Sequence, residues 1–484
     1  MNIIDGQHRR ILDETLAVLA EKLSSASTTL QKVVDRNTGA KGFFEFPLKV
    51  RRNKWLLEKK SLDAVIHELE DWQRRFDPSW FLIMRLANPI VDHQLQVARA
   101  ALPAPSSSNP SSSRTKAQSP LSLADGIRHA LRPDPPKSVL LPQRPLETTA
   151  IPFCKAAAAC LRTPTKTKWY IIDTLHLRAG QDPEALERDV RNLYKKLSGA
   201  DPFAFGLLKC KGAVPLPGAR GYELVLNAPE EGMEALQSLR HVLLNPQGAH
   251  ARLSLTRRVR IAQDLARSVS YVHTFGFVHK NICPEAVLTF TDQDAAADAT
   301  FLVGFGDFRA ADGGTFFLKD MAWEREIYRH PARQGEIPGV AYKMQHDIYS
   351  LGVCLLEIGL WEAFVDYTAD ANPRPKYGQM HQDFLQWLKE IAPEVMSGRK
   401  EAAFSLGLAG IIGDRLKDYM VHLARTKLPE KVGDRYAEVV STCLTCLDQD
   451  NDFGDEDEFT DADEIRVGVR FIETVLGRLN EITL

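Results

Sequence analysis

The stretch Tyr271–Leu288 reads YVHTFGFVHKNICPEAVL and decides how the rest of the chain is interpreted. Apolar residues recur at helical spacing before and into it, so we predict a helix over Leu253–Phe275. Three segments follow in order: FLVGFGDFR at Phe301–Arg309, YRHP at Tyr328–Pro331 and HDIYSLGVCLLEIGLW at His346–Trp361. The order helix, H-x-N-x-x-P-E, x-F-G, Y-x-x-P, D-I-Y-S-L-G is the most specific pattern in the sequence.

This order resembles that of protein kinases, in which a catalytic loop H-R-D-L-K-P-E-N follows a helix and precedes a short strand. The resemblance covers about residues 150–480 and implies an α+β, bilobal kinase-like fold. We expect an N-terminal lobe at 147–230 and a C-terminal lobe at 231–484. The resemblance also gives a structural role to five residues, namely His279, Pro284, Phe305, Gly306 and Asp347.

The positions that carry phosphoryl-transfer chemistry in kinases hold other residues here. Asn281 stands at the catalytic aspartate, and an amide cannot serve as the base for a substrate hydroxyl. Cys283 stands at the lysine of the loop. Ala286 and Gly304 stand at the two metal-binding positions and offer no side-chain oxygen to Mg²⁺. We therefore expect no catalytic residue in this degenerate loop and no bound metal.

The nucleotide-binding end is changed as well. Kinases cover the phosphates with a glycine-rich loop, but residues 149–167 contain no glycine. Asp173, in the predicted strand Lys168–Leu175, stands where the phosphate-binding lysine belongs. Asp189, in the predicted helix Pro183–Leu197, stands at the glutamate that pairs with that lysine. Two acids would repel phosphate, so no cofactor is expected and ATP binding is doubtful.

These observations favour a catalytically inactive kinase-like protein, or pseudokinase, that acts in signalling or as a scaffold. Two alternatives stay open. The first is an atypical ATP-dependent protein kinase that uses Asp307 or Asp173 in place of the missing groups, with ATP and Mg²⁺ as cofactors. The second is a membrane-acting cell-death effector that works through the N-terminal region.

Residues 1–100 carry apolar residues at helical spacing in three segments and predict a partial helical bundle. The run LEDWQRRFDPSWFLIMRL at Leu69–Leu86 resembles the later part of the fungal HeLo (prion-inhibition and propagation) domain. That resemblance implies a role in incompatibility or cell-death signalling, with protein partners and self-association through these helices. The apolar helix that acts on membranes in that family has no counterpart here, so membrane action is not expected.

Further elements are predicted around this framework. Residues 101–146 contain nine prolines and two serine clusters, so we expect a linker, interrupted by a short helix at Leu121–Leu131. Strands are predicted at Ala204–Val214 and Gly221–Leu226. Additional helices are predicted at Phe384–Ile391, Tyr436–Leu447 and Ile465–Ile482.

Composition narrows the class of protein. A formal net charge of -2 over 484 residues gives no global field that recruits nucleic acid. Residues 349–364 form the longest apolar stretch, but two glutamates interrupt it and it is too short to span a bilayer. Seven scattered cysteines give no disulfide framework, so we expect an intracellular, cytoplasmic location.

Two short motifs resemble metal-binding sequences but lack residues that a metal site requires. Cys443 and Cys446 form a single C-x-x-C within a helical pattern, which favours a packed face over a zinc site. Residues 448–464 hold ten acids in 17 positions and begin like a calcium loop. Phe453 and Phe459 stand where that loop requires glycine and glutamate. The run is therefore expected to be a solvated acidic insertion.

Overall fold

A computed structural model describes residues 34–35, 49–50, 92 and most of 120–482. Within the last range the gaps are 132–138, 144–145, 163–166, 178–180, 230–232, 234–235, 246–252, 291–298, 308, 311–321, 336–339, 370–371, 394–405, 450, 455–458 and 460–464. The chain divides into two compact units, Met1–Trp80 and Phe81–Leu484.

The first unit contributes one described feature. Strands β1 (Val34–Asp35) and β2 (Lys49–Val50) pair antiparallel, with Val34 opposite Val50. The helical periodicity did not predict these four residues as strand. Of the rest of the predicted helical bundle only Asp92 is described, as a helical residue of the second unit, and the HeLo-like run Leu69–Leu86 lies outside the described residues.

An antiparallel five-stranded sheet opens the second unit. Its spatial order is β3-β4-β5-β7-β6, so the fourth strand in sequence lies at the edge. The strands are β3 (Glu147–Ala150), β4 (Ala157–Arg162), β5 (Thr167–His176), β6 (Cys210–Pro215) and β7 (Gly221–Asn227). The predicted strands at Lys168–Leu175 and Gly221–Leu226 are confirmed as β5 and β7. The sequence did not predict β3 and β4.

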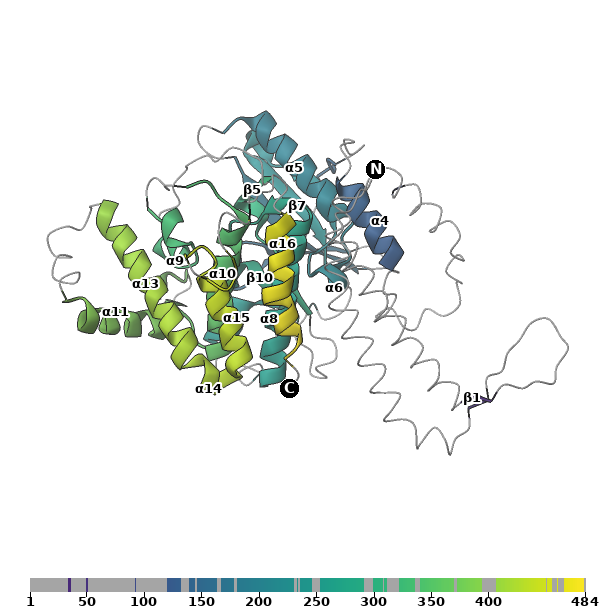
Figure 1. Ribbon diagram of the computed structural model, residues 1–484. Coiled ribbons are helices and arrows are strands. Elements are labelled where there is room, and N and C mark those ends of the chain that lie inside the picture. Colours follow the sequence, from purple (N-terminus) through teal and green to yellow (C-terminus); the bar gives the residue numbers. More distant parts are fainter. Residues whose placement is uncertain are drawn as a thin grey trace. The chain divides into compact units, whose positions relative to one another are not determined.

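Helix α5 (Pro183–Ser198) connects β5 to the later strands and packs against β6 and β7 (Figure 1). It begins as predicted, because the Asp182 carboxylate accepts hydrogen bonds from the Glu184 and Ala185 amides. The predicted strand at Ala204–Val214 is wrong in its first half. Pro202–Phe205 forms the short helix α6, which ends at Gly206 with φ 64°, and β6 starts only at Cys210.

The proline-rich segment contains folded residues. The short helix predicted at Leu121–Leu131 is confirmed as α4 (Pro120–Leu131), and Ile127 on it is fully buried. Arg128 of α4 pairs with Asp92, with a distance of 2.7 Å between Nε and Oδ1. Residues 139–141 then run along β6, where Ala213 donates to the Val139 carbonyl and its own carbonyl accepts from the Leu141 amide. The predicted linker 101–146 therefore ends in residues that extend the sheet.

The remainder of the second unit is mainly helical. Its first elements are β8 (Leu236–Ser238), α7 (Leu239–Leu244), α8 (Leu255–Thr274), β9 (Phe277–Val278), β10 (Val287–Phe290), β11 (Ala299–Leu302) and β12 (Arg309–Ala310). They are followed by α9 (Trp323–Glu326), α10 (Met344–Leu360), β13 (Val365–Tyr367), β14 (Pro375–Tyr377) and α11 (Gln379–Ile391). The last are α13 (Leu406–Thr426), α14 (Leu428–Val432), α15 (Asp434–Leu444), α16 (Ile465–Phe471), the π-helical η7 (Ile472–Gly477) and α17 (Arg478–Asn480).

Helix α10 is the core of this helical part, since every one of its residues is buried. It packs against α8, α13, α14 and α15, which surround it (Figure 1). Gly352 and Gly359 permit this packing, because a Cβ at Gly352 would lie 2.8 Å from the Cβ of Cys443. The helices predicted at Leu253–Phe275 and His346–Trp361 are confirmed as α8 and α10.

The C-terminal predictions hold in outline. The three predicted helices are confirmed as α11, α15 and the continuous run α16–η7–α17, whereas α13 and α14 were not predicted. The acidic insertion 448–464 is more ordered at its start than predicted. Asp448 forms an ion pair with Lys417, and Phe453 is fully buried. Phe453 packs on the half-buried Phe459 at 5.7 Å between ring centroids, so the two aromatics that break the calcium motif contact each other.

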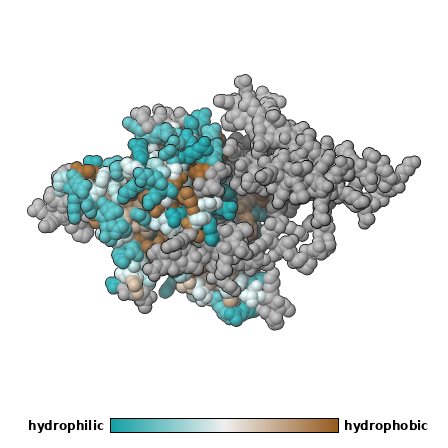
Figure 2. Space-filling model, turned by 90° about the horizontal axis from the view of Figure 1, so that it is seen from below, coloured by the Kyte–Doolittle hydropathy of each residue, from teal (hydrophilic) through white to brown (hydrophobic). Residues whose placement is uncertain are grey.

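Three findings bear on the class of protein. All seven cysteines are unpaired, and Cys443 and Cys446 are both buried. Among the described residues, no group of side chains is arranged to hold a metal ion, and no helix is long and apolar enough to cross a membrane. On the face drawn in Figure 2, apolar residues are interspersed among hydrophilic ones. The described chain is thus a mixed α+β structure, with a five-stranded antiparallel sheet, several smaller antiparallel sheets and a helical core around α10.

Candidate functional site

Asp173 joins the five-stranded sheet to the helical part. It lies in β5 and is 2% exposed. Its Oδ2 atom accepts hydrogen bonds from the amides of Gly304, at 2.9 Å, and Phe305, at 2.7 Å. The residue that stands at the phosphate-binding lysine of kinases therefore holds the backbone where the metal-binding aspartate would be.

Burial raises the pKa of the Asp173 carboxyl to about 6, although the two amides and the charge of Lys155 act in the opposite direction. The sequence placed Asp189 against this carboxylate. In the structure Asp189 is half-buried on α5, and the charged side chain that most affects Asp173 is the positive Lys155. Backbone hydrogen bonds hold the Asp173 carboxylate, and the repulsion of phosphate by Asp173 and Asp189 stays a prediction.

Gly304 leaves no room for a metal-binding side chain. Its φ is +86°, a left-handed conformation that favours glycine. A Cβ there would lie 2.8 Å from Nδ2 of Asn281 and 3.1 Å from the Cβ of Ala286. The Asn281 amide donates to the Gly304 carbonyl at 3.1 Å. Asn281, Ala286 and Gly304, the three positions that hold a base and metal ligands in kinases, are therefore packed against one another.

Asp347 in α10 fixes the loop 279–281 by accepting hydrogen bonds from its backbone amides. Oδ2 of Asp347 accepts from the His279 amide at 2.7 Å, and Oδ1 accepts from the Lys280 amide at 2.9 Å. The Tyr342 hydroxyl donates to Oδ1 at 2.7 Å, and His273 Nε2 lies 3.2 Å from Oδ2. Burial alone would raise the pKa of Asp347, but His273 and Tyr342 hold it below its usual value. Lys280, whose amide is bonded to Asp347, adopts the left-handed conformation with φ 65°.

His279 and Phe305 form the packed centre behind the loop. Both are fully buried, with ring centroids 4.8 Å apart. Burial lowers the pKa of His279 to about 4, so the ring is neutral at neutral pH. Cys283 is buried as well, which raises its pKa and keeps the thiol protonated. Pro284 is buried and begins a 3₁₀ turn over Pro284–Ala286.

The turn between β3 and β4, residues 151–156, closes down on the helical part. In kinases the corresponding turn is the glycine-rich loop. The Phe153 ring packs on Tyr367 of β13 at 4.6 Å and on His241 of α7 at 5.9 Å between centroids. The Ser238 hydroxyl donates to the Pro152 carbonyl at 2.5 Å. These contacts were not predicted from the sequence, although the apolar run Ile-Pro-Phe-Cys in place of glycines was a signal for them.

A buried ion-pair network lies beside this turn. Arg240 of α7 is fully buried, and its guanidinium pairs with Glu285 at 2.7 Å and with the fully buried Glu357 at 3.2 Å. The Tyr328 hydroxyl donates to Glu357 at 2.9 Å and also contacts Arg240. Burial would lower the pKa of Arg240, but the carboxylates raise it well above its usual value. Tyr328, the first residue of the Y-x-x-P segment, is thereby tied to α7 and α10.

Two further sequence candidates, Gly306 and Asp307, follow Phe305 in the chain. Gly306 is exposed, and a Cβ there would meet only the Thr174 carbonyl, at 3.5 Å. Asp307, named as a substitute metal ligand, closes the 3₁₀ turn Phe305–Asp307, and its side chain lies outside the described residues. The structure brings together Asp173, Asn281, Ala286 and Gly304. These four residues contact one another through hydrogen bonds to the Gly304 backbone and through close packing around Gly304.

The comparisons with known proteins are weak and partial. The chain matches no protein-family profile. It is 31% identical over 123 residues to the receptor-like kinase TMK2 of Arabidopsis thaliana, covering 25% of this chain and 13% of that protein. It is 31% identical over 129 residues to a serine/threonine-protein kinase-like protein of Arabidopsis thaliana, covering 26% of this chain and 33% of that protein. The chain therefore spans a third or less of these relatives, and it contains a region similar to protein kinases.

Proposed function

We propose that residues 147–484 form a bilobal, protein-kinase-like domain that transfers no phosphate and acts as a signalling module or scaffold. Two features support the fold. The sheet order β3-β4-β5-β7-β6, with α5 entering between its third and fourth strands in sequence, is that of a kinase N-terminal lobe. The loop 279–286 lies between α8 and β10, as a catalytic loop does.

Asp173 carries the proposal of inactivity. Phosphoryl transfer depends on cations that neutralise charge developing on the transferred group. At the lysine position this chain has a buried carboxylate whose accepting oxygen is already bonded to Gly304 and Phe305. An added triphosphate would meet a like charge and would have to displace both bonds. The Phe153 turn would also have to leave Tyr367.

The test is the melting temperature of the full chain with millimolar ATP, in Mg²⁺ and in EDTA. A ligand at about 100 times its dissociation constant adds about 2.7 kcal/mol to stability, so binding would be visible. We expect no shift in either buffer. A Mg²⁺-dependent shift together with turnover of radiolabelled ATP that Asp307→Ala abolishes would instead establish an atypical kinase. A shift in EDTA alone would make the domain a nucleotide sensor without catalysis.

We propose further that residues 1–100 contact protein partners, including a second copy of this chain. The resemblance of Leu69–Leu86 to the HeLo domain supports a role in incompatibility or cell-death signalling. The seven unpaired cysteines suit a reducing, intracellular location. Sedimentation of the full chain should show concentration-dependent association that Trp72→Asp weakens. Leakage of liposomes by the full chain would favour a membrane effector instead.

A further inference from the structure

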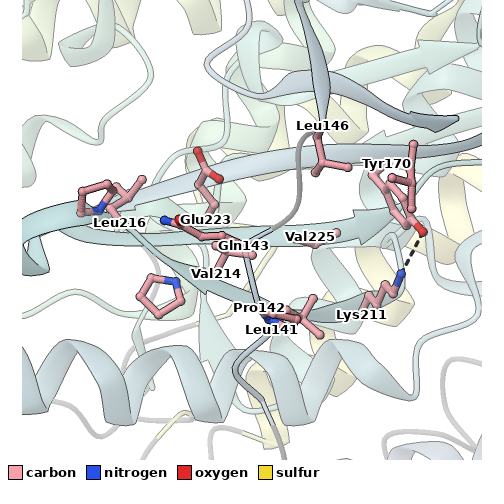
Figure 3. A pocket seen from close by; sticks show the side chains of 13 residues that line it. Leu141, Pro142, Gln143, Leu146, Tyr170, Lys211, Val214, Leu216, Glu223 and Val225 are labelled. Carbon is pink, nitrogen blue, oxygen red and sulfur yellow. Dashed lines mark hydrogen bonds between the residues drawn. The ribbon is translucent and has the colours of Figure 1, made fainter.

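An open groove lies on the side of the sheet facing away from Asp173. Its volume is about 560 Å³, within the range of about 300–1,000 Å³ usual for small-molecule sites. Residues of β4 to β7 form its floor, and Leu141, Pro142, Gln143 and Leu146 form one wall (Figure 3). Successive side chains of a strand point to opposite faces, so Tyr170 lines the groove whereas Asp173 points into the site described above. The groove is therefore a separate feature.

The floor of the groove is apolar. A buried cluster underlies it, with Leu141, Leu146, Leu161 and Val214 half-buried against the cluster, which consists of Ala159, Tyr170, Ile172 and Val225. These half-buried side chains line the groove, so they expose apolar surface to it. An occupant with an apolar body would gain stability in proportion to the apolar area that it removes from water.

The groove is built by local features of β6 and the segment before β3. The pairing of β6 with β7 skips Lys211, which makes this lysine the extra residue of a β-bulge between Cys210 and Gly212. Bulges re-aim side chains and are frequent next to binding sites. A Cβ at Gly212 would lie 2.7 Å from the Leu141 Cγ, so glycine is needed there for the 139–141 wall to lie against β6.

Two charged side chains lie at opposite ends of the groove in Figure 3. At one end the exposed Lys211 ammonium donates to the Tyr170 hydroxyl at 2.8 Å and lies 4.6 Å from the centre of that ring. These contacts hold the charge at the mouth of the groove while leaving donors for a ligand. At the other end the half-buried Glu223 lies beside Leu216. Glu223 forms no ion pair with any residue that the structure describes.

We propose that this groove binds an elongated amphipathic small molecule. Its anionic end lies at Lys211, and its amino or hydroxyl end donates to Glu223. Its apolar body lies between them on the floor of the groove, which includes Leu161 and Val225. Charge complementarity sets the orientation of the ligand, and apolar burial supplies affinity. The same arrangement disfavours a nucleotide, because a triphosphate would bring several negative charges to a groove with one lysine and one glutamate.

The test uses three probes of one chain length: decanoate, decylammonium and ω-aminodecanoate, titrated calorimetrically into the full chain. The two-ended probe should bind tightest. Hydrogen bonds to charged groups are the strong ones, so Lys211→Met should weaken decanoate and ω-aminodecanoate about tenfold and leave decylammonium unchanged. Glu223→Gln should weaken decylammonium and ω-aminodecanoate and leave decanoate unchanged.

Matched controls separate this site from general binding to an apolar surface. Lys209 is exposed two residues before Lys211 but does not line the groove, so Lys209→Met should leave all three affinities unchanged. Val214→Phe should fill the groove and abolish binding of every probe, with the circular dichroism spectrum unchanged. Equal affinities for the three probes, equal effects of the two lysine variants, or undiminished binding to a folded Val214→Phe chain would each overturn the proposal.

Discussion

The two faces of the β3–β7 sheet differ in whether their polar side chains are bonded within the chain or line an open groove. On the Asp173 face, where a kinase would admit ATP, the Asp173 carboxylate, the Asn281 amide and the Phe153 ring are each committed to partners within the chain. On the Tyr170 face, about 560 Å³ remains open above an apolar floor with a charge at each end. A groove that carries charged ends is the better candidate for a ligand than a face on which the Asp173 carboxylate and the Asn281 amide are hydrogen-bonded within the chain.

This difference has a consequence for mutagenesis. Substitutions that remove internal hydrogen bonds on the Asp173 side or in the loop 279–281 should reduce the free energy of unfolding. Substitutions of the groove's charged residues remove groups that face solvent, and they should change ligand affinity while leaving stability nearly unchanged. Measuring the free energy of unfolding and the ligand affinity for both groups of variants therefore tests whether the Asp173 side serves stability and the groove serves binding.

The largest effect is expected for Asp347→Ala. It removes the acceptor of the His279 and Lys280 amides and of the Tyr342 hydroxyl, leaving buried donors without partners. Loss of one member of a buried, hydrogen-bonded charge network costs about 3–5 kcal/mol. Urea unfolding should show this loss. Asp418→Ala, which breaks an exposed ion pair with Arg415, is the control and should cost less than about 1 kcal/mol. Similar losses in the two variants would mean that the loop is not held by Asp347.

The next largest effect is expected for Gly304→Ala. Comparison with Gly335→Ala separates the cost of backbone strain from the cost of steric overlap. A left-handed conformation costs a residue with a Cβ about 1–2 kcal/mol relative to glycine. Gly304 has φ +86° and would also place its Cβ 2.8 Å from Asn281, whereas Gly335 has φ +83° with nothing within 4 Å. We expect Gly335→Ala to cost about 1 kcal/mol and Gly304→Ala about 3 kcal/mol, measured by urea unfolding. Equal costs would show that the Asn281–Ala286–Gly304 packing is loose enough to admit a side chain.

The elements that the sequence predicted best are those with complete local signals. Helix α5 has an N-cap aspartate, a proline at its first position and a periodic apolar face, and α10 has a long apolar run. The strands β3 and β4 were missed because ETTA and AAACLR show neither alternation nor β-branched enrichment throughout. Their place is fixed by pairing with β5, a tertiary contact.

The candidate site was predictable in composition and not in geometry. The replacements at Asp173, Asn281, Ala286 and Gly304 are visible in the sequence. The hydrogen bonds from Gly304 and Phe305 to Asp173 join residues more than 130 positions apart, so no local pattern shows them. The groove was not predicted for the same reason, because it depends on a bulge at Lys211 and on segment 139–141 lying against Gly212.

A pH titration tests the Asp173 side with a smaller effect. The pKa of Asp173 is raised from 3.8 to about 6, so the folded state holds this proton more tightly than the unfolded state. Its contribution to stability is full below pH 3.8 and is lost as pH rises through about 6. At about 1.4 kcal/mol per pKa unit, the loss is roughly 2–3 kcal/mol.

Asp173→Asn should remove this dependence. One amide oxygen can accept both backbone hydrogen bonds, as Oδ2 does now, without a buried charge. Urea unfolding at pH 4 and pH 8 should therefore show a smaller decline for the variant, which should be the more stable protein at pH 8 by about 2 kcal/mol. A decline of the same size in both proteins would assign the pH dependence to other groups and would weaken the structural interpretation of Asp173.

The smallest expected effect on stability belongs to the groove. Lys211 is exposed, so its hydrogen bond to Tyr170 is screened by water, and Lys211→Met should change the free energy of unfolding by less than about 1 kcal/mol. Tyr170→Phe leaves the buried ring in place and removes only the hydroxyl. A double-mutant cycle on these residues should give a small coupling energy for unfolding and a larger one for ω-aminodecanoate binding, since the hydroxyl positions the ammonium for the ligand. A coupling that is large for unfolding and absent for binding would make the Lys211–Tyr170 pair a structural contact. The two faces of the sheet would then no longer differ in the way described above.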